Sequence, residues 1–174
     1  MKRTAEIQEI LTHWSYLARG LQYDPASFYE TLQGKIEGEK IKGVKMTTAI
    51  LSQKGMLSRK RDYLRVQYDN LVFDICGAPF GETNFFFSYW MGVKNMRGCL
   101  AILLNILLSI PFIGLLIQKN LESLTYFEQD TAEMFDALIS AIILEEVDAI
   151  MEEKEIEPIP DEARKPDDKK LRSL

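Results

Sequence analysis

The chain of 174 residues has few of the side chains from which catalytic and metal sites are most often built. It contains one histidine, His13, and two cysteines, Cys76 and Cys99, which do not form a CxxC pair. A single histidine cannot complete a Cys/His zinc set and leaves little scope for a Ser–His–Asp or Cys–His arrangement. We therefore expect no enzyme activity, no metal and no cofactor, and we interpret both cysteines as small buried residues.

The chain also lacks an excess of basic charge. Its net charge is -5 and its isoelectric point about 5.1, which argues against a nucleic-acid partner. With 47% hydrophobic residues the composition is that of a folded protein, not of a disordered one. The average hides a division: the net charge is +4 over residues 1–97, zero over 98–117 and -9 over 118–174.

Charged side chains are absent altogether from residues 98–117, which read GCLAILLNILLSIPFIGLLI. Twenty residues of helix rise about 30 Å, which matches the hydrocarbon core of a bilayer. The stretch lies too far along the chain to be a signal peptide. It predicts a transmembrane or re-entrant helix, since Pro111 and Gly114 would allow the chain to bend back. The alternative is a buried helix of a soluble protein.

A small and polar stripe runs along this stretch at intervals of four residues, formed by Ala101, Asn105 and Ser109. These three side chains would share one helix face, and in lipid a hydrogen bond from an asparagine to a neighbouring helix is worth about 1 kcal/mol. We predict helix–helix association there, with a second copy or with another membrane protein. In the alternative interpretation Asn105 bonds its own backbone or a water molecule.

Basic residues suggest which parts of the chain lie against lipid. Arg59, Lys60, Arg61 and Arg97 are predicted to contact anionic headgroups, each worth about 1 kcal/mol, although a solvated strand end would look the same. More basic residues precede the apolar stretch than follow it, which predicts a cytoplasmic N-terminal domain. The expected location is a membrane, in a bacterium the inner membrane, with the lipid bilayer as a partner.

The pattern before residue 97 predicts an α+β domain. Apolar residues at three- and four-residue steps predict a first helix over 4–19, and Asp24-Pro25 predicts the start of a second one that buries Phe28, Leu32 and Ile36. Alternating residues over 43–91, with a turn at Asp69-Asn70, predict an antiparallel meander of four strands.

After the apolar stretch, residues 126–154 predict a long amphipathic acidic helix, and the Pro- and charge-rich residues 155–174 predict a flexible tail. The chain would thus consist of a domain over 1–97, a membrane segment over 98–117, a helix within 118–154 and a tail.

Three stretches carry a resemblance to other proteins: KRDYLRV at 60–66, VFDICGAPFG at 72–81 followed by FFFSYW at 85–90, and TYF at 125–127 followed by DTAEMF at 130–135. Through them, roughly residues 25–165 resemble a group of small uncharacterised bacterial membrane-associated proteins. The resemblance implies a soluble part, a hydrophobic segment and a C-terminal helix, and it carries over no site.

We therefore expect a membrane-anchored, homo-oligomeric structural or interaction protein without a catalytic site. One alternative is an oligomeric membrane-disrupting effector or pore component, with Asn105 and Ser109 lining the opening. Another is a soluble binding module in which helix 98–117 is buried. An enzyme built on Asp74 would need a partner for that carboxylate, and we name none for it.

Overall fold

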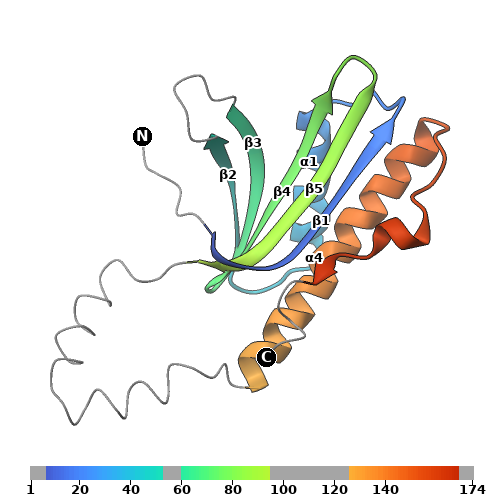
Figure 1. Ribbon diagram of the computed structural model, residues 1–174. Helices are drawn as coiled ribbons and strands as arrows, with labels where there is room; N and C mark the ends of the chain where they lie inside the picture. The colour runs from blue at the N-terminus through green and yellow to red at the C-terminus, as the bar shows by residue number, and fades with distance from the viewer. Residues whose placement is uncertain (1–6, 53–59, 95–125, 169–174) are drawn as a thin grey trace, which may run out of the picture.

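The computed structural model describes residues 7–52, 60–94 and 126–168. Within them an antiparallel sheet is covered on one face by two helices (Figure 1). The strands lie in the order β2-β3-β4-β5-β1-β6. In chain order the elements are β1 (Ile7–Arg19), α1 (Pro25–Gly38), β2 (Val44–Ser52), β3 (Lys60–Tyr68), β4 (Leu71–Phe80), β5 (Asn84–Lys94), α4 (Tyr126–Glu153), a 3-10 turn (Asp161–Arg164) and the two-residue β6 (Asp167–Asp168).

The fold prediction is wrong at its first element, because residues 7–19 form strand β1 and not a helix. The register of β1 against β5 shifts between Ile7 and Glu9 and again between Ile10 and Thr12. These irregularities interrupt the two-residue period, so the apolar residues fall three and four positions apart and imitate a helix. Beyond them the alternation is regular, with Trp14, Tyr16 and Ala18 opposite Tyr89, Phe87 and Phe85.

The strand count and the transmembrane helix are also corrected. β2 to β5 pair consecutively, but β1 joins the edge of β5, so the sheet has five long strands instead of four. The structure describes only two α-helices, and neither is both long and apolar enough to cross a bilayer. The predicted segment 98–117 lies outside the described residues.

Helix α1 begins as its sequence predicts, since the Asp24 carboxylate accepts a hydrogen bond from the Ser27 backbone N–H at 3.0 Å and Pro25 follows the cap. The helix buries Phe28, Leu32 and Ile36 against the sheet. The Phe28 ring lies 5.2 Å from that of Phe87 on β5. α1 therefore covers the side of the sheet to which Phe87 points.

Helix α4 packs on the same side of the sheet. Its Phe135 ring lies 5.6 Å from Tyr68 on β3 and 5.5 Å from Phe73 on β4. Further along, its buried apolar side chains join those of α1 and the strands in one hydrophobic core: Ala132, Ile139, Ile142, Ile143, Val147, Ile150 and Met151. The residues before and after the apolar stretch thus share a core. We call the side of the sheet away from these helices the open face, because neither helix covers it, although several side chains on it are buried.

The described residues after α4 pack back onto the domain, where composition predicts a flexible tail. Ile159 is buried, and the Trp14 indole N–H donates to the Ala163 carbonyl at 2.7 Å. Arg164 makes two hydrogen bonds to the Asp148 carboxylate, at 2.8 and 2.9 Å. β6 then pairs with β1 at Thr12 and His13.

Replacing Gly77 by alanine should destabilise the fold, because a Cβ there would collide with the Phe28 ring above it. We expect a loss of about 1–3 kcal/mol in the free energy of unfolding, measured by urea denaturation. The matched control is Gly34→Ala in α1, where a Cβ meets nothing within 4 Å and should stabilise by about 0.5–1 kcal/mol. Equal effects at the two glycines would contradict the close packing of α1 on β4.

Candidate functional site

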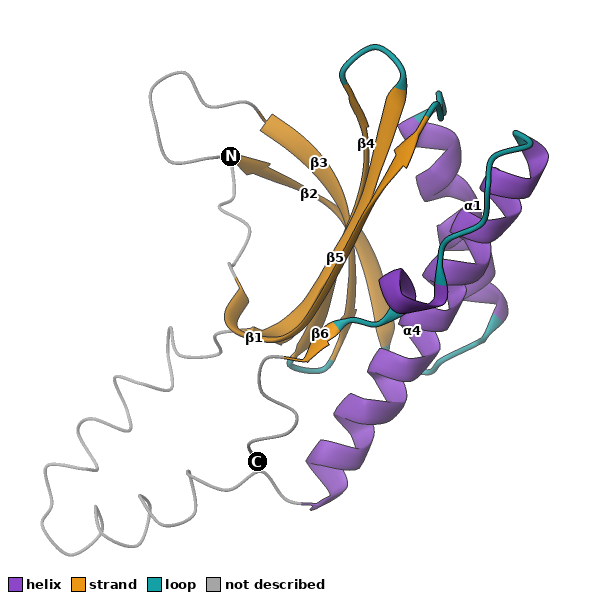
Figure 2. Cartoon of the chain, turned by 45° about the vertical axis from the view of Figure 1, so that its right-hand side comes forward, coloured by secondary structure: helices purple, strands orange, loops and turns teal. Residues whose placement is uncertain are grey.

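The last described residue before position 95 and the first one after position 125 lie at the same end of the sheet, which we call the Lys94 end. β5 finishes there, and the Lys94 backbone N–H donates to the Asn70 carbonyl in the β3–β4 turn at 2.8 Å. α4 begins at Tyr126 and reaches Tyr68, the last residue of β3, with Phe135. Figure 2 shows both attachment points at the lower end of the domain.

The two attachment points belong to one rigidly packed unit. Besides the apolar core, the Thr12 hydroxyl on β1 donates to the Asp136 carboxylate on α4 at 3.0 Å. Lys35 on α1 forms ion pairs at 3.1 Å with both Glu145 and Glu146 of α4. Separating α4 from the sheet would expose this core and break these contacts, so both parts must lie on the same side of any membrane.

Large apolar side chains are exposed where α4 begins. Tyr126 is 90% exposed, Phe127 78% and Met134 72%. Phe127 and Met134 are seven residues apart and therefore share a helix face, which is turned away from the core. Aromatic side chains are frequent at membrane–water interfaces, because their rings suit the headgroup layer.

Of the four residues predicted to contact lipid headgroups, the structure describes two, Lys60 and Arg61, which are neighbours at the start of β3. Lys60 begins β3 and Tyr68 ends it, so Arg61 lies about 23 Å along the strand from the Lys94 end. The Arg61 guanidinium lies over the Phe86 ring on the open face, 5.9 Å from its centre. Arg59, Arg97 and the association residues Ala101, Asn105 and Ser109 lie outside the described residues.

An ion pair is buried on the open face. Arg65 on β3 donates through Nε and a terminal nitrogen to the two carboxylate oxygens of Asp74 on β4, each at 2.6 Å. The residues are only 4% and 2% exposed. Asp74, the carboxylate for which we named no partner, is therefore held by two hydrogen bonds from the Arg65 guanidinium.

The open face also carries aromatic side chains and a cysteine near this ion pair. Trp90 is opposite Asp74, and its ring stacks on His13 of β1 with centroids 3.7 Å apart. Cys76 is fully buried near Tyr63, and burial raises the pKa of its thiol. A protonated, inaccessible thiol is a poor nucleophile, which agrees with a packing role for Cys76.

Tyr29 of α1 joins two strands where they separate. The β3–β4 pairing runs from Tyr68–Leu71 to Leu64–Ile75. Past that point the Tyr29 hydroxyl donates to the Asp62 carbonyl at 2.7 Å and accepts from the Gly77 backbone N–H at 3.0 Å. One side chain thus satisfies backbone groups of both strands, and burial raises the pKa of Tyr29.

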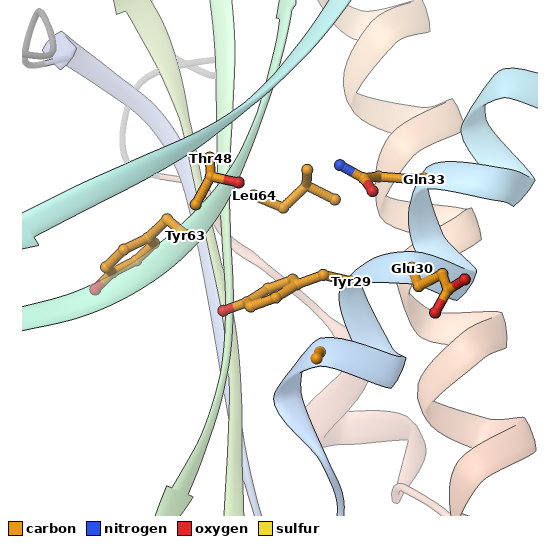
Figure 3. A pocket seen from close by; sticks show the side chains of 7 residues that line it. Tyr29, Glu30, Gln33, Thr48, Tyr63 and Leu64 are labelled. Atoms are coloured by element: carbon orange, nitrogen blue, oxygen red, sulfur yellow. The ribbon is translucent and has the colours of Figure 1, made fainter.

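A cavity of about 380 Å³ opens beside this tyrosine, between α1 and strands β2 and β3 (Figure 3). In the figure Gln33 points from α1 toward the strands, and the Tyr29 ring reaches toward Tyr63. The cavity is lined by Ala26, Tyr29, Glu30, Gln33, Thr48, Tyr63 and Leu64. Sequence reasoning missed it, because its walls come from three separate elements.

Over the described ranges there is no group of three or more His, Cys, Asp or Glu side chains that could hold a metal ion. Comparison of the chain with protein-family models, curated proteins and solved structures found no match. The resemblance to bacterial membrane-associated proteins therefore stays a prediction.

Replacing Tyr29 by phenylalanine should destabilise the domain by about 1–3 kcal/mol, because it leaves the Gly77 N–H and the Asp62 carbonyl without their partner. Thermal and urea unfolding followed by circular dichroism would measure this. Tyr68→Phe is the control, since the half-buried Tyr68 ring packs on Phe135 through its carbons. If both variants unfold at the same temperature and urea concentration as the unmodified protein, the hydrogen bonds of the Tyr29 hydroxyl do not contribute to stability.

Replacing Asp74 by asparagine should cost about 3 kcal/mol, because Arg65 would keep a buried charge without the carboxylate that compensates it. The exposed ion pair between Lys154 and Glu153, at 2.8 Å, supplies the comparison: Glu153→Gln should leave the unfolding midpoint unchanged. Equilibrium urea curves on both variants test this. A stable Asp74→Asn protein would show that the pair is dispensable.

Proposed function

We propose that this protein is an interaction protein attached to one face of a membrane, with the whole described domain on that face. The observation that carries the proposal is the position of the two ends of residues 95–125 at the Lys94 end of a single core. The uncharged residues 98–117 would supply the attachment.

The length of the apolar stretch favours attachment from one side. Its 20 residues suffice for one crossing as a helix, and one crossing would place α4 and the sheet on opposite sides. Because α4 and the sheet share a core, the stretch must return to the side from which it enters. Pro111 and Gly114 allow such a bend.

The surface of α4 supports the same orientation. Tyr126, Phe127 and Met134 are exposed beside the attachment points, where a bilayer surface would receive their apolar atoms. In this arrangement the sheet and α4 both lie in the cytoplasm, at a bacterial inner membrane. Association through Ala101, Asn105 and Ser109 stays a prediction.

Labelling of engineered cysteines tests one-sided attachment. Glu39 precedes and Glu152 follows the apolar stretch, and both are exposed. Each would be changed to cysteine in a Cys76→Ala, Cys99→Ala background and expressed in a bacterial host. We expect both cysteines to react with a membrane-impermeant maleimide in inside-out vesicles, and neither in right-side-out vesicles.

Two results would contradict the proposal. Labelling of Glu39→Cys and Glu152→Cys from opposite sides would require a crossing and a domain divided between compartments. Recovery of the full chain in the supernatant after high-speed centrifugation, without detergent, would exclude attachment itself. Circular dichroism of the purified variants serves as the control for folding.

A further inference from the structure

Strand β2 forms an edge of the sheet that carries few of the usual features that block pairing. It pairs with β3 from Val44–Tyr68 to Ser52–Lys60 without a register shift, and its other edge pairs with no strand among the described residues. The nine residues contain no proline and no glycine, and Lys45 is their single charge. Natural proteins commonly protect such edges with bulges, prolines or charges.

Helices α1 and α4 do not extend far enough to cover β2 completely on their side of the sheet. Thr48 is exposed, and Ile50 is 54% exposed although it points to the side that α1 and α4 cover. The cavity between α1 and the strands lies at this point, with Thr48 in its lining. A strand added along β2 would therefore place the side chain opposite Thr48 beside the cavity.

The lining of the cavity suits a long basic side chain. Tyr29, Tyr63 and Leu64 offer rings and methyl groups to an aliphatic stem or a planar guanidinium. Glu30 is the one charged residue of the lining, and Gln33 adds a polar amide. Asp62 lies on the same face of β3 as Leu64 and is exposed, so the surroundings add a second carboxylate.

We propose that the β2 edge and this cavity bind an extended segment of a partner protein, with an arginine or lysine opposite Thr48. Backbone hydrogen bonds to β2 would supply affinity, and the basic side chain in the cavity would supply specificity. The sheet would gain a strand next to β2.

A second copy of the chain fits the β2 edge less well than an unrelated segment does. This comparison rests on the proposed function. Two identical β2 strands related by a two-fold axis pair antiparallel, which turns the Lys94 ends of the copies in opposite directions. Both copies could not then be attached to one membrane surface. An unrelated segment carries no such restriction.

Selection from a phage-displayed library of random nine-residue peptides tests the proposal, with the full-length protein in detergent micelles as bait. We expect enrichment of sequences that alternate β-branched residues around a central arginine or lysine. Dissociation constants of the most enriched peptide, made synthetically, would then be measured by fluorescence anisotropy.

Neighbouring residues on β2 provide matched variants. Thr48→Arg puts a cation into the cavity and should weaken the peptide at least about tenfold, whereas Thr47→Arg, on the open face, should change binding less than about twofold. Glu30→Gln should weaken the arginine peptide about fivefold and leave its leucine analogue unchanged. Circular dichroism would check that each variant is folded.

Several outcomes would overturn the proposal: no enriched sequence, enrichment without a basic residue, or equal effects of Thr47→Arg and Thr48→Arg. A dimer seen by light scattering that Thr48→Arg dissociates would show that the occupant is a second copy. None of these measurements depends on membrane attachment. A negative result here would therefore contradict the peptide site alone, whereas the cysteine labelling tests the attachment.

Discussion

The arrangement of this protein depends on the packing of α4 against the sheet. Phe135 lies among the rings of Tyr68 and Phe73, and the buried stripe that follows it joins the core built by residues 7–94. This contact joins two parts of the chain that are separated by 31 intervening residues, 95–125. It places Lys94 and the start of α4, the two described neighbours of that segment, at one end of the sheet. The orientation that we propose relative to a membrane, and the limit on how residues 98–117 could enter it, both rest on this packing.

The two faces of the sheet differ in how they satisfy polar groups. On the helix-covered side the core is mostly apolar, and two hydroxyl groups connect the helices to the strands. The Thr12 hydroxyl on β1 donates to Asp136 of α4, and the Tyr29 hydroxyl of α1 bonds the backbones of β3 and β4 where they separate. The open face buries the Arg65–Asp74 pair and stacks Trp90 on His13. Burying an ion pair without loss of stability demands good geometry, which the bidentate contact supplies.

Much of the local structure is predictable from the sequence because its causes are local. The Asp24-Pro25 cap, the stripe of Phe28, Leu32 and Ile36, and the turn at Asp69-Asn70 each act over a few residues. The Arg65–Asp74 pair was also within reach, since the two residues lie at equal distances from that turn and therefore face each other in the hairpin. The first strand was not, because its irregular register against β5 hides the two-residue period.

The sequence by itself determined the α+β class, the second helix, the hairpin turn, the long acidic helix and the uncharged stretch of 20 residues, since each depends on periodicity or composition within a short window. Only the tertiary structure decided that β1 pairs with β5, that α4 packs on the sheet, and that Tyr29, Thr48 and Tyr63 surround one cavity. Those contacts join residues far apart in the chain, and a side chain carries no local signal of a distant partner. Their formation depends on which apolar faces can be buried together in one core.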